Sequence, residues 1–430
     1  MSLQSSCPAS SVKIAFAPSK KAPSALALFQ KALDLPPPEK CSPIAVAMSG
    51  GVDSSVAAAA LAYLGYPVIG ITMRLYTSKD PARKNACCAG RDIADAAGVA
   101  AHMGFTHYVL DYEKRFKAAV IDPFALSYQD GNTPIPCILC NQTVKFTDLL
   151  EQSKKLGCAA LITGHYIRRT PVQNEKAASK TDVWMEKAVD ADKDQSYFLF
   201  RTSMAGLSYL RFPLGGLKKE ETRELAAFFG LKISEKPESQ DICFVGDGHY
   251  TDVLKKLHPE GLMPGPIVDT SGKQLGTHKG ISFYTIGQRR GVGISTGQPL
   301  FVVDICPQTQ TVVVGPKAAL LRRSIDLVDL HLLGDPDEFI QAPLKVRLRS
   351  SGAAVPAKVL IDASSKTAMV HLAQPTAGLA PGQACVFYTK DRVLGGGTIA
   401  RHRPTFTRTQ ESLSEKNVAP TKPLATRPAA

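Results

Sequence analysis

The chain lacks the features that would place it in a membrane or outside the cell. Its 430 residues include no apolar run near the ~18 to 20 residues of a membrane span, and the alanine-rich run at 57–65 is too short. Residues 1–41 lack the continuous apolar segment of a secretory signal. We therefore expect a soluble protein whose ten cysteines are reduced thiols rather than a disulfide framework.

Acidic residues are scarce at both ends of the chain. Residues 1–30 contain no Asp or Glu but three Lys and seven Ser, which predicts a disordered basic extension over residues 1–41. Such an extension fits a cytoplasmic protein, and it is also compatible with a transit peptide leading to the mitochondrial matrix. Residues 401–430 are predicted to be a second disordered tail. The net charge of +13 suggests a polyanionic partner such as nucleic acid, although a solvated basic surface explains it nearly as often.

Strand and helix patterns alternate over residues 42–235. Strand-like apolar runs occur at 44–48, 67–75, 107–112 and 159–166, and helical patterns occur at 54–64, 88–104 and 141–157. This alternation predicts an α/β fold, a doubly wound, Rossmann-like parallel sheet covered on both faces. We expect a small central domain over 236–295. Short β-branched runs between Gly and Pro residues then predict an antiparallel barrel or sandwich over 296–400.

The segment SGGVDSS, residues 49–55, lacks the lysine of the best-known phosphate loop, GxxxxGK[ST]. Its two glycines allow backbone amides to approach an anion, and its serines and the following helix N-terminus add donors. Asp53 is suited to hold the loop or to reach a phosphate through Mg²⁺. Without the lysine, the loop is better suited to grip pyrophosphate as a leaving group. The alternative is a strand-to-helix turn without function.

Three cysteines outside this loop are candidates for chemistry. Cys137 and Cys140 directly precede a predicted helix, where the pKa of a thiol is lowered, and Cys243 lies in a predicted loop. Two separated thiols suit persulfide chemistry, in which one carries sulfur and the other releases it by forming a disulfide. A zinc site is disfavoured because no second ligand pair accompanies Cys137 and Cys140. A [4Fe–4S] cluster held by Cys137, Cys140 and Cys243 remains an alternative.

These motifs together resemble the tRNA-specific 2-thiouridylases (MnmA) of the pyrophosphate-loop ATP pyrophosphatase superfamily. The matching motifs are SGGVDSSV, TPIPCILCNQTVKF, TGHY, KDQSYFL, FPLG, ESQDICF, YTIGQRRGVGI, PGQACVFY and DRVLGGG. They follow the family's order from residue 44 to about 400. The resemblance implies an ATP pyrophosphatase domain of the adenine nucleotide alpha hydrolase type, a small central domain and a C-terminal β-barrel that contacts tRNA.

The resemblance also implies a reaction. An enzyme of this family, a tRNA-uridine 2-sulfurtransferase, uses ATP and Mg²⁺ to adenylate C2 of the wobble uridine, position 34 of tRNA. A persulfide on Cys243 then supplies sulfur, Cys140 resolves the intermediate, and AMP and pyrophosphate are released. The implied partners are the tRNA anticodon stem-loop and a sulfur donor, either a cysteine desulfurase or a sulfur-relay protein; the free protein is expected to be a monomer. A small-molecule amidating ligase and a non-enzymatic tRNA-binding protein are the competing hypotheses.

Site residues follow from the same resemblance, position by position. Catalytic roles fall on Cys140, Cys243 and Asp53. ATP contacts fall on Ala47, Met48, Ser49, Gly50, Gly51, Val52, Asp53, Ser54, Met73 and Gly164. Contacts to tRNA fall on His165, Lys193, Asp194, Gln195, Arg347, Leu348 and Gln383, and no resident metal ligand is assigned. Ile135 and Cys137 stand where several members have Asn and Asp, so contacts to the target base are doubtful there.

Overall fold

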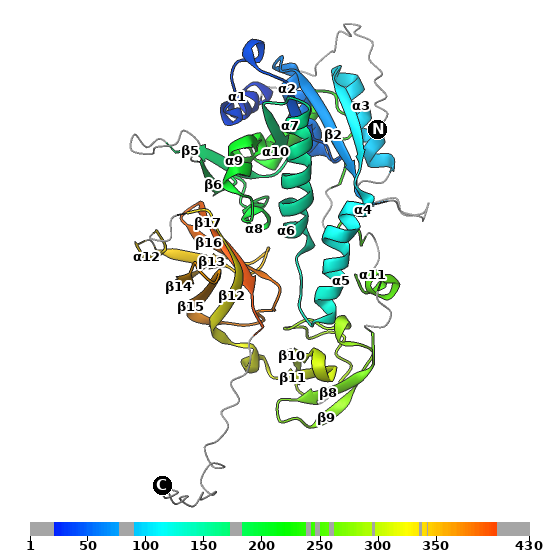
Figure 1. The fold of residues 1–430 in the computed structure, drawn as a ribbon, viewed down its shortest axis with the longest axis vertical. Helices are drawn as coiled ribbons and strands as arrows, with labels where there is room; N and C mark the ends of the chain where they lie inside the picture. The colour runs from blue at the N-terminus through cyan, green and yellow to red at the C-terminus, as the bar shows by residue number, and fades with distance from the viewer. Residues whose placement is uncertain are drawn as a thin grey trace, which may run out of the picture.

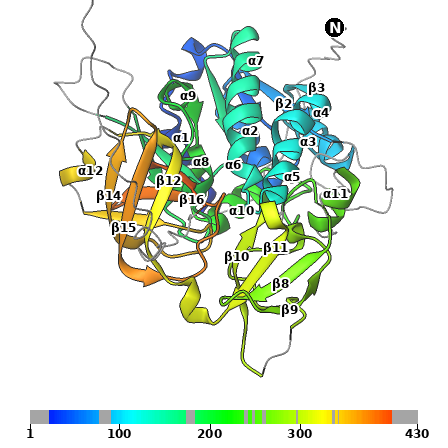
Figure 2. The ribbon, with the colours of Figure 1, turned by 60° about the horizontal axis from the view of Figure 1, so that its bottom comes forward.

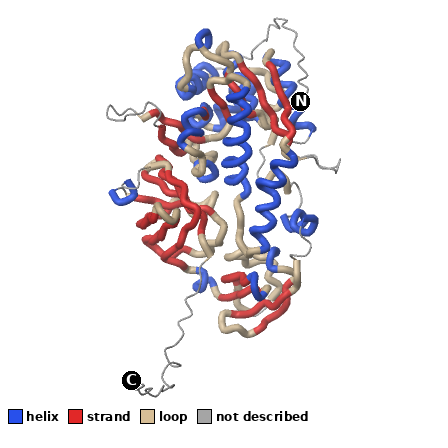
Figure 3. Tube along the Cα trace, in the orientation of Figure 1, coloured by secondary structure: helices blue, strands red, loops and turns tan. Residues whose placement is uncertain are grey.

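The computed structural model describes residues 21–76, 90–172, 183–237, 242–245, 250–257, 262–294, 297–334, 338–341 and 343–401. Figure 1 shows three parts: an α/β domain at the top, a small sheet of strands β8–β11 at the bottom, and a barrel of strands β12–β17 to the left. Figure 3 shows how helices are concentrated in the first part and strands in the other two. Among the described residues, no helix combines the length and apolar composition needed to cross a membrane.

The first part is built on a five-stranded sheet of order β3-β2-β1-β4-β7, whose neighbouring strands are all parallel. Its strands are β1 (Ile44–Ala47), β2 (Val68–Arg74), β3 (Thr106–Asp111), β4 (Ala160–Thr163) and β7 (Leu210–Arg211). The chain adds strands outward from β1 to β3 and then returns to place β4 on the other side of β1. The predicted doubly wound sheet is confirmed, and its topological switch point, where ligands bind in such folds, lies between β1 and β4.

Helices cover both faces of this sheet, and each face has its own hydrophobic cluster. The helices of the first part are α1 (Ala22–Leu33), α2 (Val52–Tyr63), α3 (Gly90–Met103), α4 (Glu113–Phe116), α5 (Asp122–Gln129), α6 (Pro136–Cys140), α7 (Leu149–Lys155), α8 (Ser196–Leu199), α9 (Met204–Tyr209) and α10 (Lys219–Phe228), and of these α2, α3, α7 and α9 contact its strands directly. Because both faces of the sheet are covered, β1 and β4 need no polar side, and their residues are almost all apolar.

The helix predicted over 141–157 begins earlier than expected. A π-helical segment, Asn141–Asp148, joins α6 to α7, and the residues at both junctions have right-handed helical backbone angles. The helix therefore starts at Pro136, which occupies its first turn, where proline's missing N–H costs nothing. As a result, Cys140 lies inside a helix instead of before one.

The prediction of disorder over residues 1–41 is wrong for residues 22–33, which form α1. One face of this helix is buried against α10 and against the residues around Leu214. The buried residues, Ala22, Ala25, Leu26, Phe29 and Leu33, recur at helical spacing. Composition alone hid this stripe because residues 1–41, taken together, are rich in Lys, Ser and Ala. The first twenty residues lie outside the described part of the chain.

A core substitution tests whether α1 belongs to the folded unit. Phe29 is fully buried, while its neighbour Leu28 is 44% exposed. We expect Phe29→Ala to lower the free energy of unfolding by about 3–5 kcal/mol, because it removes a buried aromatic ring and leaves a cavity. Leu28→Ala is the matched control and should change stability by less than about 0.5 kcal/mol. Urea unfolding of the two variants measures both values, and equal losses would contradict the packing of α1.

The predicted border between the central domain and the barrel, residue 295, is wrong. Strands β8 (Gly265–Asp269), β9 (Gln274–His278), β10 (Phe301–Cys306) and β11 (Thr311–Gly315) form one four-stranded sheet of order β10-β11-β8-β9. The central unit thus includes residues 301–315. Its central pairing is parallel, between β11 and the distant β8, so local sequence pattern did not reveal it. Helix α11 (Tyr250–Leu257) packs on α5 beside it (Figure 2).

The C-terminal strands form an antiparallel barrel, as predicted. They are β12 (Arg322–Leu332), β13 (Leu344–Arg347), β14 (Val355–Asp362), β15 (Thr367–Thr376), β16 (Ala384–Thr389) and β17 (Arg392–Ile399), with the short helix α12 (Glu338–Gln341) between β12 and β13. Pairing of β12 with both β15 and β17 closes the barrel. A hairpin from the first part, β5 (Ile167–Pro171) and β6 (Val183–Lys187), extends the sheet at β17.

Candidate ATP and thiol site

The SGGVDSS loop lies at the switch point, between the end of β1 and the start of α2. Gly50 has φ +74°, and a Cβ there would lie 2.2 Å from the carbonyl oxygen of Asp92, so only glycine fits. The Ser49 N–H donates to Ser54 Oγ at 3.1 Å, which closes the loop on the first turn of α2. The N-cap residue of α2, Gly51, makes no side-chain capping bond. The first amides of α2 and its dipole therefore favour an anion at this end.

Gly164, in the TGHY motif, lies against the same turn. A Cβ at this position would lie 2.7 Å from the Ser54 nitrogen and 2.9 Å from the Asp53 carbonyl carbon. The segment after β4 therefore contacts the loop directly, and glycine is required for that contact. Met73, at the end of β2, is buried in the cluster that covers the other side of the site. Both predicted ATP contacts thus border the switch point, and their roles toward ATP stay predictions.

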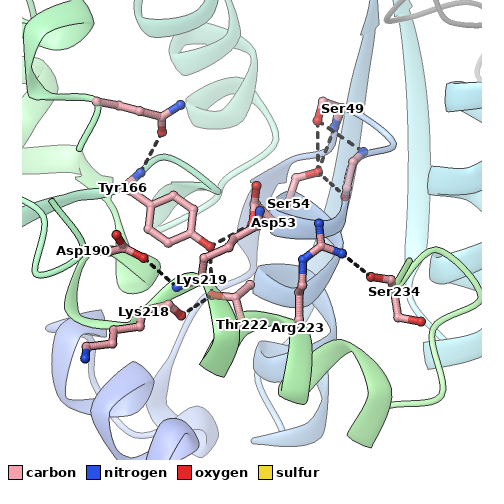
Figure 4. Close-up of polar contacts among 12 residues, drawn as sticks. Ser49, Asp53, Ser54, Tyr166, Asp190, Lys218, Lys219, Thr222, Arg223 and Ser234 are labelled. Atoms are coloured by element: carbon pink, nitrogen blue, oxygen red, sulfur yellow. Dashed lines mark hydrogen bonds and ion pairs between the residues drawn. The ribbon is translucent and has the colours of Figure 1, made fainter. Parts of the chain in front are cut away.

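Sequence reasoning missed a lysine beside the loop. Lys219, the first residue of α10, donates from Nζ to Asp53 Oδ1 at 2.6 Å (Figure 4). The Tyr166 hydroxyl donates to the same oxygen at 2.9 Å and lies 2.9 Å from Thr222 Oγ1. The side chain of Lys219 is only 10% exposed, against 31% for Asp53. The loop motif contains no lysine, but the side chain of Lys219 lies beside the loop. Lys219 follows Asp53 by 166 residues in the chain.

A second lysine holds the other side of the loop. Lys236 Nζ donates to the carbonyl oxygen of Gly50 at 2.9 Å and to the carboxylates of Asp92 and Asp95, on α3, at 2.7 and 2.5 Å. Burial lowers the pKa of Lys236, but the hydrogen bonds and charges of the two carboxylates outweigh it and leave the pKa raised. Lys236 therefore stays charged and ties the loop to α3. It precedes Cys243 by seven residues in the sequence.

The thiols predicted to be catalytic share one hydrophobic cluster. Cys140 and Met73 are buried within it, and Cys243 and Ala47 pack against it. The hydroxyl of Tyr76 donates to the Cys243 carbonyl oxygen at 2.7 Å. Cys140 is a free thiol. Chain segments that are about a hundred residues apart in sequence are thus brought together around the same core.

The expected lowering of the Cys140 pKa is wrong. Cys140 is 7% exposed, and burial raises the pKa of its thiol because a thiolate is poorly solvated there. The nearby charge of Lys145 opposes this shift only in part. The error arose from placing the helix start after Cys140, since only a thiol at the N-terminus benefits from the helix dipole. Cys137, one turn earlier, is exposed.

The residues predicted to contact tRNA are largely engaged within the protein. His165 Nδ1 lies 2.9 Å from Thr163 Oγ1, and its ring packs on Phe146. Burial, with the charge of Lys145, lowers the pKa of His165 to about 3, so this imidazole is neutral at physiological pH. These contacts satisfy His165 within the protein, and its contact to tRNA stays a prediction. Lys193 is half-buried, and its contact to tRNA stays a prediction.

The KDQ turn and the barrel residues form a contact between the two parts. Asp194, whose side chain is 4% exposed, accepts from Arg347 Nη1 at 2.9 Å. Gln195 Oε1 accepts from the Tyr166 N–H at 2.8 Å. Gln383 Nε2 donates to the carbonyl oxygen of Thr133, just before α6, at 2.8 Å. Leu348 is 6% exposed in the barrel core, so its side chain is not on the surface.

Removing one partner of the Asp194–Arg347 pair tests this contact. We expect Asp194→Ala to lower the free energy of unfolding by about 3–5 kcal/mol, because it leaves a largely buried guanidinium without its carboxylate. Asp192→Ala, two residues earlier at an exposed position, is the matched control and should change little. Thermal and urea unfolding measure the difference. A loss below about 1 kcal/mol would identify the pair as a surface contact with little energetic weight.

Three family models match the chain in succession. Residues 42–247 match "tRNA methyl transferase HUP domain", residues 251–316 match "tRNA methyl transferase PRC-barrel domain", and residues 322–399 match "Aminomethyltransferase beta-barrel domain". The end of the second match, at residue 316, agrees with the four-stranded sheet that ends at Gly315.

Curated relatives match nearly the whole of the same region. "tRNA-specific 2-thiouridylase MnmA" of Methylorubrum extorquens (strain PA1) is 51% identical over 376 residues, covering 86% of this chain and 96% of the relative. The protein of that name from Maricaulis maris (strain MCS10) is 52% identical over 360 residues, covering 83% and 87%. Among solved structures, "U34-tRNA thiolase NcsA from Methanococcus maripaludis with its [4Fe-4S] cluster" matches with TM-score 0.33 and 19% identity, over 56% of this chain and 74% of that one.

Proposed function

The chain belongs to the tRNA-specific 2-thiouridylase family, and from this premise we propose how its site performs the reaction. It is a sulfurtransferase that converts uridine in tRNA to 2-thiouridine and uses ATP. We propose that the base is the wobble uridine, position 34. The observation that supports the proposal is the shared cluster: Met73 and Cys140 are buried in one hydrophobic cluster, and Cys243 and Ala47, which ends β1 before the SGGVDSS loop, pack against it. We propose that ATP and the two thiols act on one base there.

The first proposed step is activation of the base. The C2 oxygen of uridine attacks the α-phosphorus of ATP, and pyrophosphate leaves with the electron pair of the broken P–O bond. The loop amides and the N-terminus of α2 lie where they can stabilise that charge. Asp53 is the residue that would hold Mg²⁺; its contacts to Lys219 and Tyr166 both use Oδ1. Mg²⁺ would neutralise phosphate charge there.

The second proposed step moves sulfur. The terminal sulfur of a Cys243 persulfide attacks C2, and AMP leaves, so the base is joined to Cys243 through a disulfide. Cys140 attacks Cys243 Sγ, which releases 2-thiouridine and leaves a Cys140–Cys243 disulfide. An external dithiol must then reduce that disulfide, and a sulfur donor protein must recharge Cys243. We propose a cysteine desulfurase or a sulfur-relay protein as that donor.

The iron–sulfur alternative does not fit the described geometry. Cys137 is exposed while Cys140 is buried. Within the described ranges, no group of three or more His, Cys, Asp or Glu side chains is placed to hold a metal ion. We therefore route no step through a cluster. We further propose that the free protein is a cytoplasmic monomer; the mitochondrial alternative rests largely on residues 1–20, which lie outside the described part of the chain.

The raised pKa of Cys140 predicts a pH dependence for sulfur release. Its thiol is protonated at neutral pH, but attack on a disulfide needs the thiolate. The thiolate fraction rises about tenfold per pH unit below the pKa. We therefore expect single-turnover release of thiolated tRNA from a preformed Cys243 adduct to accelerate between about pH 7 and about pH 9. Pyrophosphate release should not follow this rise, and a flat release profile would contradict the role of Cys140.

Nucleoside analysis tests the reaction in cells. Mass spectrometry of digested tRNA should show loss of 2-thiouridine derivatives in a strain that lacks this protein. Re-expression of the natural chain should restore them. Unchanged 2-thiouridine in the deletion strain, with no second copy of the gene, would overturn the proposed function.

A further inference from the structure

Lys219 occupies an unusual position for a lysine. Its backbone begins α10, and its side chain runs toward the first turn of α2, where Nζ lies 2.6 Å from Asp53 Oδ1 (Figure 4). Only 10% of the side chain is exposed. Burial of an ammonium group carries a desolvation cost that an ion pair often fails to offset, so such pairs are weak contributors to stability. Since the buried Lys219–Asp53 pair adds little stability, the position of Lys219 beside an anion-binding loop suggests that it has a function in binding.

The surroundings fix where this ammonium lies. The Lys219 N–H donates to Asp190 Oδ2 at 2.9 Å, and the Lys218 N–H donates to Glu221 Oε2 at 2.7 Å, which anchors the start of α10. The Tyr166 ring lies beneath the ammonium, with 5.5 Å between Nζ and the ring centroid. A group held in this way needs little reorganisation when a charge develops next to it.

The charges around the two lysines differ. Lys236 faces two carboxylates and a carbonyl oxygen, so its charge is compensated independently of any ligand. Lys219 contacts Asp53, the residue suited to Mg²⁺, and Asp53 also accepts from Tyr166. If Asp53 held Mg²⁺, its carboxylate would interact less strongly with Lys219, and the Lys219 ammonium could then donate to phosphate oxygens.

We propose that Lys219 is the pyrophosphate-binding cation of this site, supplied from α10 in place of the lysine that the loop lacks. The proposal rests on the proposed function, in which the loop binds ATP and releases pyrophosphate. In the resting protein, Lys219 pairs with Asp53. With ATP bound, it donates to the β- and γ-phosphate oxygens, and it stabilises the bridging oxygen that takes the electron pair when the bond to the α-phosphorus breaks.

Comparison of ATP with AMP separates this role from a structural one. We expect Lys219→Met to weaken binding of ATP about 10- to 100-fold, since it removes a charge-assisted hydrogen bond, as measured by calorimetry. Affinity for AMP, which lacks the β- and γ-phosphates, should change less than about twofold. tRNA-dependent pyrophosphate release should slow by a similar factor to the loss for ATP. Lys218→Met, at the adjacent exposed position, is the matched control and should behave as the unchanged protein.

A second variant keeps the test decisive if Lys219→Met fails to fold. Lys219→Gln keeps a hydrogen-bond donor near Asp53 but loses the charge, and it should show the same selective loss for ATP. Equal losses for ATP and AMP, or ATP affinity unchanged in both Lys219 variants, would overturn this inference and leave the proposed function standing. Failure of the unchanged protein to bind ATP or to release pyrophosphate would overturn the proposed function, and the inference with it.

Discussion

Replacing Cys243 or Cys140 by serine is expected to reduce tRNA thiolation by about 10³-fold or more, because each thiol forms a covalent bond that serine cannot form. The two variants should stop at different points. Cys243→Ser cannot carry the persulfide, so it should still release pyrophosphate but yield no sulfur-linked tRNA. Cys140→Ser should accumulate tRNA joined to Cys243 through a disulfide.

The two outcomes are separable on a denaturing gel. The expected adduct in Cys140→Ser migrates as a protein–tRNA conjugate, and a small thiol should cleave it and liberate thiolated tRNA. Low thiol concentrations are therefore needed during the assay. Cys137→Ser and Cys158→Ser are matched controls, the first exposed in the same helix and the second buried in the same cluster. Wild-type thiolation by Cys140→Ser with a persulfide donor would exclude the mechanism.

Local sequence revealed those parts of the site that lie on contiguous chain. The SGGVDSS loop follows a buried strand and precedes a helix, and β1, α2 and the loop between them lie where the pattern predicted. Gly50 and Gly164 are required by contacts closer than any Cβ allows. The position of the loop depends on the backbone within a few residues and on strand order, and both can be read from the sequence. The contacts that require these glycines, with Asp92 and with Ser54, are tertiary.

The parts that sequence reasoning missed depend on tertiary contacts. Lys219 reaches Asp53 only because α10 packs beside α2, and nothing local to either segment indicates that neighbour. Strand β11 pairs with β8 across more than forty residues, which moved the domain border. The start of α6 is different: Pro136 is a recognised helix-start signal, and its use would have placed Cys140 inside the helix.

The expected tRNA contacts stay predictions, but the structure gives three of these residues contacts within the protein. Asp194, Arg347 and Gln383 were assigned to tRNA from the resemblance, yet each makes a hydrogen bond between the first part and the barrel. Gln383 holds Thr133, three residues before the helix that carries Cys140. The placement of the barrel therefore bears directly on the segment that leads to the thiol. Any contact of Gln383 with tRNA would act on that segment as well.

Asp53→Ala is expected to abolish ATP-dependent pyrophosphate release and also to destabilise the fold. Without Asp53, the Lys219 ammonium keeps its desolvation cost and loses a carboxylate 2.6 Å away. We expect a loss of about 2–3 kcal/mol in the free energy of unfolding, below the ~3–5 kcal/mol of a fully buried pair because 31% of the Asp53 side chain is exposed.

A double-mutant cycle separates the two effects. Asp53→Ala with Lys219→Met removes both charges, so it should recover most of the lost stability and remain inactive. The exposed pair Lys117–Asp122 has the same N···O distance, 2.6 Å, with side chains 56% and 34% exposed, and Asp122→Ala should cost about 0–1 kcal/mol. If Asp53→Ala lowered the free energy of unfolding no more than Asp122→Ala, the burial of Lys219 would not affect stability. A larger loss that the double variant reverses would establish that the Lys219 ammonium destabilises the fold once its carboxylate is removed, so that the two charges depend on each other in this site.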